Sequence, residues 1–260
     1  MRGRGYQGGV SFGPTVTPPI VKQLLIANAA VFFGQILSQG WLGYDLLSAL
    51  GAVVPREFFA GQIWQAFTYM FLHGGLGHIA VNMLTLWMFG APLALAWGAR
   101  RFLRFYLLCG VGAGLLIATL PYVLGAVGLH FPSLSPSIPT LGASGAVYGV
   151  LLAYSLTWPE HTIMLLFPPI PIRAIYLIPF VFALNYILGP SNVSHVGHFG
   201  GVLAAWILIR REHGASLLPN VASLRWRLKR WRMRRQLRAV RVEEDQWRRR
   251  AREHDDHRIH

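Results

Sequence analysis

Six apolar stretches, separated by shorter polar or mixed segments, run along this chain. A helix needs about 20 apolar residues to cross the hydrocarbon core of a bilayer, and fewer if it starts below the membrane surface. The pattern therefore predicts an all-α membrane protein with a bundle of six transmembrane helices, the fourth of them short and starting at depth after a loop rich in Pro and Ser. The predicted spans are residues 20–40, 76–96, 102–127, 143–158, 172–189 and 195–211.

The composition agrees with a membrane protein. Hydrophobic residues make up 53% of the 260 residues and charged residues 13%, whereas soluble domains carry about 25% charged residues. Residues 213–260 hold 14 of the 24 Lys and Arg residues and 6 of the 10 Asp and Glu residues. We therefore expect a disordered arm over residues 1–19, a six-span domain over 20–212 and a basic cytoplasmic tail over 213–260.

The positive charges predict how the chain crosses the membrane. Lys and Arg residues precede the first span, lie between spans two and three and between spans four and five, and follow span six. The loops after spans three and five hold none, and the loop after span one holds only Arg56. Because positive residues stay on the cytoplasmic side, both termini should be cytoplasmic, in a membrane of the bacterial cell-membrane type. Spans two, four and six then begin toward the outer side.

The tail, with its 14 basic and 6 acidic residues, contributes +8 of the net charge of +14. In residues 225–252 Arg side chains alternate with Trp, Leu and Met, which predicts a basic helix lying on anionic lipids at the inner membrane surface. A solvated tail is the alternative, and no binding to nucleic acid is expected. The single cysteine, Cys109, excludes an intrachain disulfide.

Reactive side chains lie where two of the spans begin. Ser144 starts span four, and serine becomes a strong nucleophile when a base takes its proton. His198, in the first turn of span six, is the candidate base. The N–H of Ser144 lacks a partner inside its helix, so it can donate to an oxyanion. These features together indicate hydrolysis carried out within a bilayer.

Further side chains can complete such a site. His78 and Asn82 are four residues apart, so they project from one face of span two and can donate to the same oxyanion. Tyr148 lies one turn after Ser144, where its ring can pack against the imidazole. Small residues at four-residue spacing let spans four and six approach closely, as a hydrogen bond between Ser144 and His198 requires. These small residues are Gly145, Gly149, Ala153, Gly197 and Gly201.

Each residue alone has a plainer explanation. Ser144 can cap a helix, Asn82 can join two helices and Tyr148 can simply pack. His195 and His198 have a spacing that suits a metal, but no carboxylate or thiolate lies nearby in the apolar body and HExxH is absent. We therefore expect no metal and no cofactor, and the grouping of these residues on one side favours catalysis.

The motifs and their order resemble the rhomboid intramembrane serine proteases over about residues 20–211. His73 with the segment 78–82 is similar to the family's H…HxxxN, segment 142–145 to its GxSG, and segment 198–201 to its HxxG. The resemblance implies a Ser144–His198 dyad without a third carboxylate. It also implies that His78 and Asn82 donate to the oxyanion, that Gly142 and Tyr148 support the site, and that His73 is structural.

Two positions depart from the family's pattern. Many members have Trp-Arg in the loop after span one, whereas this chain has Trp64-Gln65. Many also have a Glu after the glycine of span two, and residues 90–94 contain none.

The resemblance implies a serine endopeptidase that cuts peptide bonds in or near transmembrane helices of membrane-protein substrates. The main alternative is a non-catalytic rhomboid-like protein that binds transmembrane helices, which should have lost a dyad or oxyanion residue. A transporter or channel is the second, and it should show polar groups through the depth of the membrane.

Overall fold

The computed structural model describes residues 13–164, 170–188 and 194–212, and these residues are mostly helical. Each of the six predicted ranges contains a helix. The predicted tail, and residues 1–12 of the predicted arm, lie outside the described residues. The helices are α1 (Pro19–Leu42), α2 (Leu46–Gly51), α3 (Pro55–Phe59), α4 (Gln65–Thr68), α5 (Leu76–Trp97), α6 (Ala99–Ala126), α7 (Ser144–Thr157), α8 (Leu177–Leu188) and α9 (His195–Glu212). Short 3₁₀ turns occupy Tyr69–Phe71, Pro132–Leu134 and Ala174–Tyr176.

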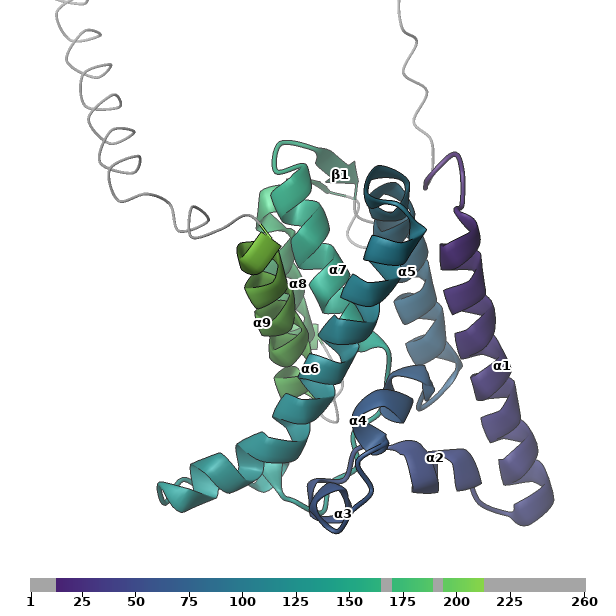
Figure 1. Cartoon of the computed structure of the whole chain (residues 1–260), viewed down its shortest axis with the longest axis vertical. Helices are drawn as coiled ribbons and strands as arrows, with labels where there is room; N and C mark the ends of the chain where they lie inside the picture. The colour runs from purple at the N-terminus through teal and green to yellow at the C-terminus, as the bar shows by residue number, and fades with distance from the viewer. Residues whose placement is uncertain (1–12, 165–169, 189–193, 213–260) are drawn as a thin grey trace, which may run out of the picture. The chain divides into compact units, whose positions relative to one another are not determined.

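The long helices lie side by side, with α2, α3 and α4 at one end and strand β1 (Thr162–Met164) at the other (Figure 1). Helix α7 is central, since nine of its 14 residues are buried. Glycines bring α6, α7 and α9 unusually close. A Cβ on Gly145 of α7 would lie 2.7 Å from the Cβ of Ala113 in α6, and a Cβ on Gly200 of α9 would lie 2.9 Å from the Cα of Ala113. The small residues of α7 therefore serve as the packing surface for both neighbours.

The outer faces of the helices are those of an integral membrane protein. Among the described residues, α1, α5 and α6 are long and apolar enough to cross a bilayer, and α7 and α8 are shorter apolar helices. Large apolar side chains remain exposed on these helices, including Ile26 at 67% and Phe33 at 60% on α1. Because water disfavours such broad apolar surfaces, lipid is their natural surrounding.

The fifth predicted span begins later than expected. Residues 171–173 form strand β2 (Pro171–Arg173), which pairs antiparallel with β1 (Thr162–Met164), and α8 starts only at Leu177. The prediction was wrong here because an apolar run can form either a strand or a helix. A proline at the edge of a two-stranded sheet is tolerated, since it has no N–H to donate.

The segment between α1 and α5 contains the three short helices α2, α3 and α4 and is held by several internal hydrogen bonds. Trp64 Nε1 donates to the carbonyl of Leu50, and Thr68 Oγ1 donates to that of Gly51. The same segment keeps apolar side chains exposed, among them Ile63 at 69%. Its backbone is thus held by internal hydrogen bonds while one face stays apolar.

Helices α5 and α6 are joined by Gly98 alone, whose φ of +83° suits a residue without a side chain. Helix α5 continues through Pro92 to Trp97. Pro121 lies inside α6, and α6 changes direction near its carboxyl end in Figure 1. An interior proline removes one helical hydrogen bond, which accounts for a bend there.

Candidate functional site

The beginnings of α5, α7 and α9 lie toward the same end of the helices, the end at which α2, α3 and α4 lie (Figure 1). Ser144 is the first residue of α7, so its N–H is among those that find no partner within the helix. His78 lies in the first turn of α5 and His198 in the first turn of α9. The predicted residues of three separate spans are therefore gathered at one end of the bundle.

Gly142 brings the loop before α7 against α5. Its φ is +129°, a conformation that side chains disfavour, and its N–H donates to the carbonyl of Tyr69 at 2.9 Å. A Cβ at this position would lie 2.9 Å from His78 Nε2 and 3.8 Å from Ser144 Oγ. Only glycine fits here, and its small size lets the imidazole and the hydroxyl face the same small space.

A backbone hydrogen bond to the His78 ring indicates which of its nitrogens carries the proton. The N–H of Gly74 donates to His78 Nδ1 at 3.2 Å, so in the neutral ring Nδ1 is the acceptor and Nε2 carries the hydrogen. Nε2 is the nitrogen that lies beside Gly142 and Ser144. His78 thus presents an N–H donor to the space beside the candidate nucleophile.

Asn82 is buried, with 5% of its surface exposed, one turn further along α5. Its Nδ2 donates to the carbonyl of His78 at 2.9 Å. One amide hydrogen is therefore occupied within the helix, and the second is the one that a substrate oxygen would have to use.

His198 is 6% exposed and is stacked on Tyr148. The two ring centroids are 4.1 Å apart and the planes differ by 12°. Phe182 of α8 meets the tyrosine ring edge-on, with the centroids 5.1 Å apart. The predicted packing of Tyr148 against the imidazole is thus present in the structure.

Ser144 and His198 are not hydrogen-bonded to each other in the described structure, and His198 Nδ1 is a buried nitrogen without a partner there. Ser144 lies one helical turn before the tyrosine on which the imidazole is stacked. Bonds between a nucleophile and its base are often long in unliganded enzymes and shorten when the substrate binds. The structure thus places Ser144 in the first turn of α7 and His198 in the first turn of α9, without a hydrogen bond between their side chains.

The approach of α9 to α7 is set by glycines, as the spacing predicted. A Cβ on Gly145 would lie 3.2 Å from the carbonyl oxygen of Gly197, and one on Gly149 would lie 3.3 Å from that of Gly201. A Cβ on Gly201 would overlap the carbonyl group of Gly145. The two backbones are therefore in direct contact beside the candidate site.

A sequence model of the Rhomboid domain matches residues 60–212. The chain belongs to the rhomboid family. RHOMBOID-like protein 12, mitochondrial, of Arabidopsis thaliana is 32% identical over 207 residues, 74% of this chain and 59% of that protein. Rhomboid protease GluP of Bacillus subtilis is 29% identical over 190 residues, 72% of this chain and 34% of that protein. Rhomboid protein 1, mitochondrial, of Saccharomyces cerevisiae is 36% identical over 162 residues, 58% of this chain and 40% of that protein.

The matched regions cover between 34% and 59% of the length of these three rhomboid relatives. The chain thus spans less than two thirds of the length of each of these relatives.

At one of the two positions where this rhomboid departs from many members, Gln65 stands in place of arginine. Its side chain is fully buried, accepts from the N–H of Val54 at 3.0 Å, and donates to Gln62 Oε1 at 2.9 Å and Glu57 Oε2 at 3.3 Å. The amide therefore ties together α3, α4 and the strand-like residues before them. At the second position, Gly90 packs against Phe102 of α6, with no carboxylate in residues 90–94.

Gln35 of α1 holds the loop in front of α5. Its Oε1 accepts from the N–H of His73 at 2.9 Å and its Nε2 donates to the carbonyl of His73 at 3.2 Å, as well as to Asp45 and Ser48 at 2.8 Å each. Burial of Asp45 raises the pKa of its carboxyl, but the hydrogen bonds from Ser48 and Gln35 outweigh this and lower the pKa below its ordinary value. His73 is buried at 2% exposure, in keeping with a structural position.

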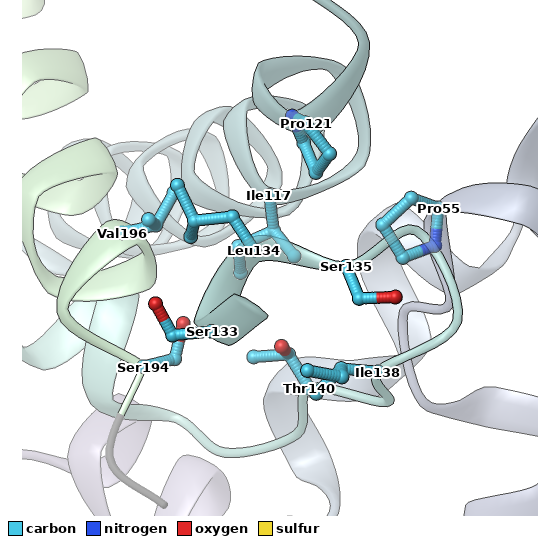
Figure 2. Close-up of a pocket in the computed structure, with 10 residues that line it drawn as sticks. All are labelled: Pro55, Ile117, Pro121, Ser133, Leu134, Ser135, Ile138, Thr140, Ser194 and Val196. Carbon is cyan, nitrogen blue, oxygen red and sulfur yellow. The ribbon is translucent and has the colours of Figure 1, made fainter. Parts of the chain in front are cut away.

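A small cavity of about 30 Å³ lies between α6, the loop after it and the start of α9 (Figure 2), with room for about one or two waters. Hydroxyl groups of Ser133, Ser135, Thr140 and Ser194 line it together with apolar side chains. Neither Ser144 nor His198 lines this cavity.

The described residues contain no group of three or more His, Cys, Asp or Glu side chains that could hold a metal ion. His195, the other histidine of α9, is exposed, and its ring is 6.4 Å from that of His198 and nearly perpendicular to it.

One polar residue of the site was not predicted. Asn185 of α8 donates through Nδ2 to the hydroxyl oxygen of Tyr148 at 2.7 Å. It is an isolated amide in the apolar sequence Leu177–Leu188. Polar residues within membrane spans are costly and are usually functional, so this position was the signal that could have revealed it.

Proposed function

We propose that this rhomboid is an intramembrane serine endopeptidase that uses Ser144 as nucleophile and His198 as general base. The observation that carries the proposal is the stacked pair of Tyr148 and His198 one turn from Ser144, with His78 Nε2 facing the same space. Similarity to a relative named as a rhomboid protease supports it. The proposed substrates are membrane proteins, cut in or near their transmembrane helices.

The chemistry follows from these groups. His198 takes the proton of Ser144 as the oxygen attacks the substrate carbonyl, and the oxyanion accepts hydrogen bonds from the Ser144 N–H, His78 Nε2 and the free amide hydrogen of Asn82. His198 then gives the proton to the leaving amine, leaving an acyl-enzyme. A water that loses its proton to His198 hydrolyses the ester and frees Ser144.

We infer a six-span arrangement with both termini in the cytoplasm of a bacterial-type cell. Helix α7 has 14 residues and is therefore about 21 Å long, shorter than the roughly 30 Å hydrocarbon core. If its last turn reaches the cytoplasmic surface, Ser144 lies below the outer surface. Water would then enter from the outer side, past the loop that precedes α7.

A non-catalytic rhomboid that binds transmembrane helices is the second candidate. It would bind substrate helices at the same end of the bundle without cutting them, and the unbonded Ser144 and His198 are compatible with it, just as they are with a protease that has no substrate bound. The presence of every predicted dyad and oxyanion residue favours the protease.

Labelling with a fluorophosphonate tests the proposal on the purified full chain. The wild type should become labelled and cleave a reconstituted transmembrane substrate, and Ser144→Ala and His198→Ala should do neither. Ser155→Ala is the matched control, because Ser155 is a buried serine of the same helix whose hydroxyl donates to the carbonyl of Leu151. Cleavage that persists in Ser144→Ala would remove the proposal, and an unlabelled wild type that binds the substrate would favour the second candidate.

A further inference from the structure

Asn185 connects α8 to the candidate base through one side chain. Its Nδ2 donates to the Tyr148 hydroxyl oxygen at 2.7 Å and to the carbonyl of Val181, in its own helix, at 3.0 Å. The bond to Tyr148 links side chains 37 residues apart. Both donor hydrogens of the amide are therefore used, one within α8 and one between helices.

The orientation of His198 depends on its ring contacts. In a serine hydrolase with a triad, a carboxylate bonded to Nδ1 holds the imidazole in its working plane. Here Nδ1 is buried and has no partner among the described residues. The near-parallel ring of Tyr148, whose centroid is 4.1 Å from that of the imidazole, is thus the contact that defines the plane of the imidazole. The ring of Phe182 lies edge-on to the imidazole, with the two centroids 6.5 Å apart.

Tyr148 can orient the imidazole only if its own ring is held. Its hydroxyl is the atom farthest from the backbone, so a hydrogen bond there limits the swing of the whole ring about the Cα–Cβ bond. Asn185 makes that bond, from a different helix. The chain of contacts therefore runs from Asn185 to Tyr148 to His198.

We propose, on the basis of the protease function above, that Asn185 is a positioning residue for His198. It holds the Tyr148 ring against the imidazole, and so takes over the orienting function for which a triad uses a carboxylate. Asn185 does not touch the reacting atoms. It acts on the rate of acylation, because a tilted imidazole reaches Ser144 less often in the correct geometry.

The competing explanation is that Asn185 only joins α7 and α8. Hydrogen bonds between membrane helices contribute about 0.6 kcal/mol on average, so this role would alter stability alone. The two explanations differ in kcat, which a bond that serves packing only would leave unchanged.

The test compares Asn185→Leu, Tyr148→Phe and the double variant in the purified full chain, reconstituted in bilayers. The measurements are kcat and KM for a transmembrane substrate, the rate of fluorophosphonate labelling and the unfolding temperature. Each single variant should lower kcat and the labelling rate about three- to tenfold, with KM unchanged, as expected for one lost hydrogen bond. The double variant should be no slower than the slower single one, because both changes break the same contact.

Asn28→Leu is the matched control. Asn28 is a buried amide of α1 whose Nδ2 donates to the carbonyl of Leu24, four residues earlier, as Asn185 does to Val181. It should lose stability and keep the wild-type kcat. If Asn185→Leu does not fold, Tyr148→Phe still removes the same bond.

Wild-type kcat and labelling rate in Asn185→Leu, or in Tyr148→Phe if only that variant folds, would overturn the positioning role while the protease function stood. Additive losses in the double variant would also overturn it. Absence of Ser144-dependent labelling in the wild type would instead reject the protease function itself.

Discussion

Replacing Gly201 by alanine should lower the activity of this rhomboid far more than its stability. A Cβ at this position would overlap the carbonyl oxygen of Gly145, with the carbonyl carbon at 2.6 Å and the Cα at 3.0 Å. All three are backbone atoms, so no side chain can turn aside to make room. Helices α7 and α9 must therefore move apart by roughly 1 Å before the methyl group fits.

That movement acts directly on the proposed dyad, because Gly145 follows Ser144 and Gly201 lies one turn after His198. A misplacement of about 1 Å can lower an enzymatic rate about a hundredfold. The expected change in stability is smaller, since overpacking costs about 1–3 kcal/mol and replacing a helical glycine by alanine returns up to about 1 kcal/mol. We thus expect kcat/KM to fall about a hundredfold with only a modest drop in unfolding temperature.

The assay is cleavage of a reconstituted transmembrane substrate, with thermal unfolding measured on the same preparation. Gly40→Ala is the matched control, because Gly40 is a helical glycine of α1 with nothing within 4 Å of the added Cβ. It should keep full activity. Wild-type kcat/KM in Gly201→Ala would show that the close contact of α7 and α9 does not align the site, and the reasoning would be refuted.

The other predictions concern the loop before α5 and the oxyanion. Gln65→Leu leaves the buried N–H of Val54 without its acceptor, so the free energy of unfolding should fall by about 1–3 kcal/mol, and an unchanged unfolding temperature would contradict this. Asp45→Ala removes the cap on the N–H of Ser48 and should cost about 1 kcal/mol at neutral pH. Because the folded pKa of Asp45 lies below its unfolded value, this stabilisation is complete above about pH 4 and is lost as the pH falls through the folded pKa; the difference from wild type should shrink in acid, and growth of the difference would contradict the assignment. Asn82→Ala should lower the cleavage rate about 10²–10³-fold if its amide binds the oxyanion, and a rate within twofold of wild type would exclude that role.

The positions of the helices could be predicted well because they depend on local hydropathy. The predicted range 76–96 became Leu76–Trp97, and 195–211 became His195–Glu212. The antiparallel pairing of β1 with β2 was missed, because residues 162–164 lay outside every predicted span and residues 172 and 173 were assigned to a helix. The short helices α2, α3 and α4 were missed too, because they are stabilised by contacts such as those of Gln65 rather than by length.

The sequence by itself determined where the long apolar helices form and which polar side chains they carry, because a polar group inside an apolar span is costly and stands out against its neighbours. It also determined that α7 and α9 can touch, since only glycine allows two backbones so close. The tertiary structure alone decided which polar groups are bonded among the described residues: Asn185 is bonded to Tyr148 and Gln35 to His73, whereas Ser144 is not bonded to His198. These pairings depend on the rotation of each helix about its axis and on differences of a few tenths of an ångström in the distance between helices. Hydropathy along a chain carries no information about either.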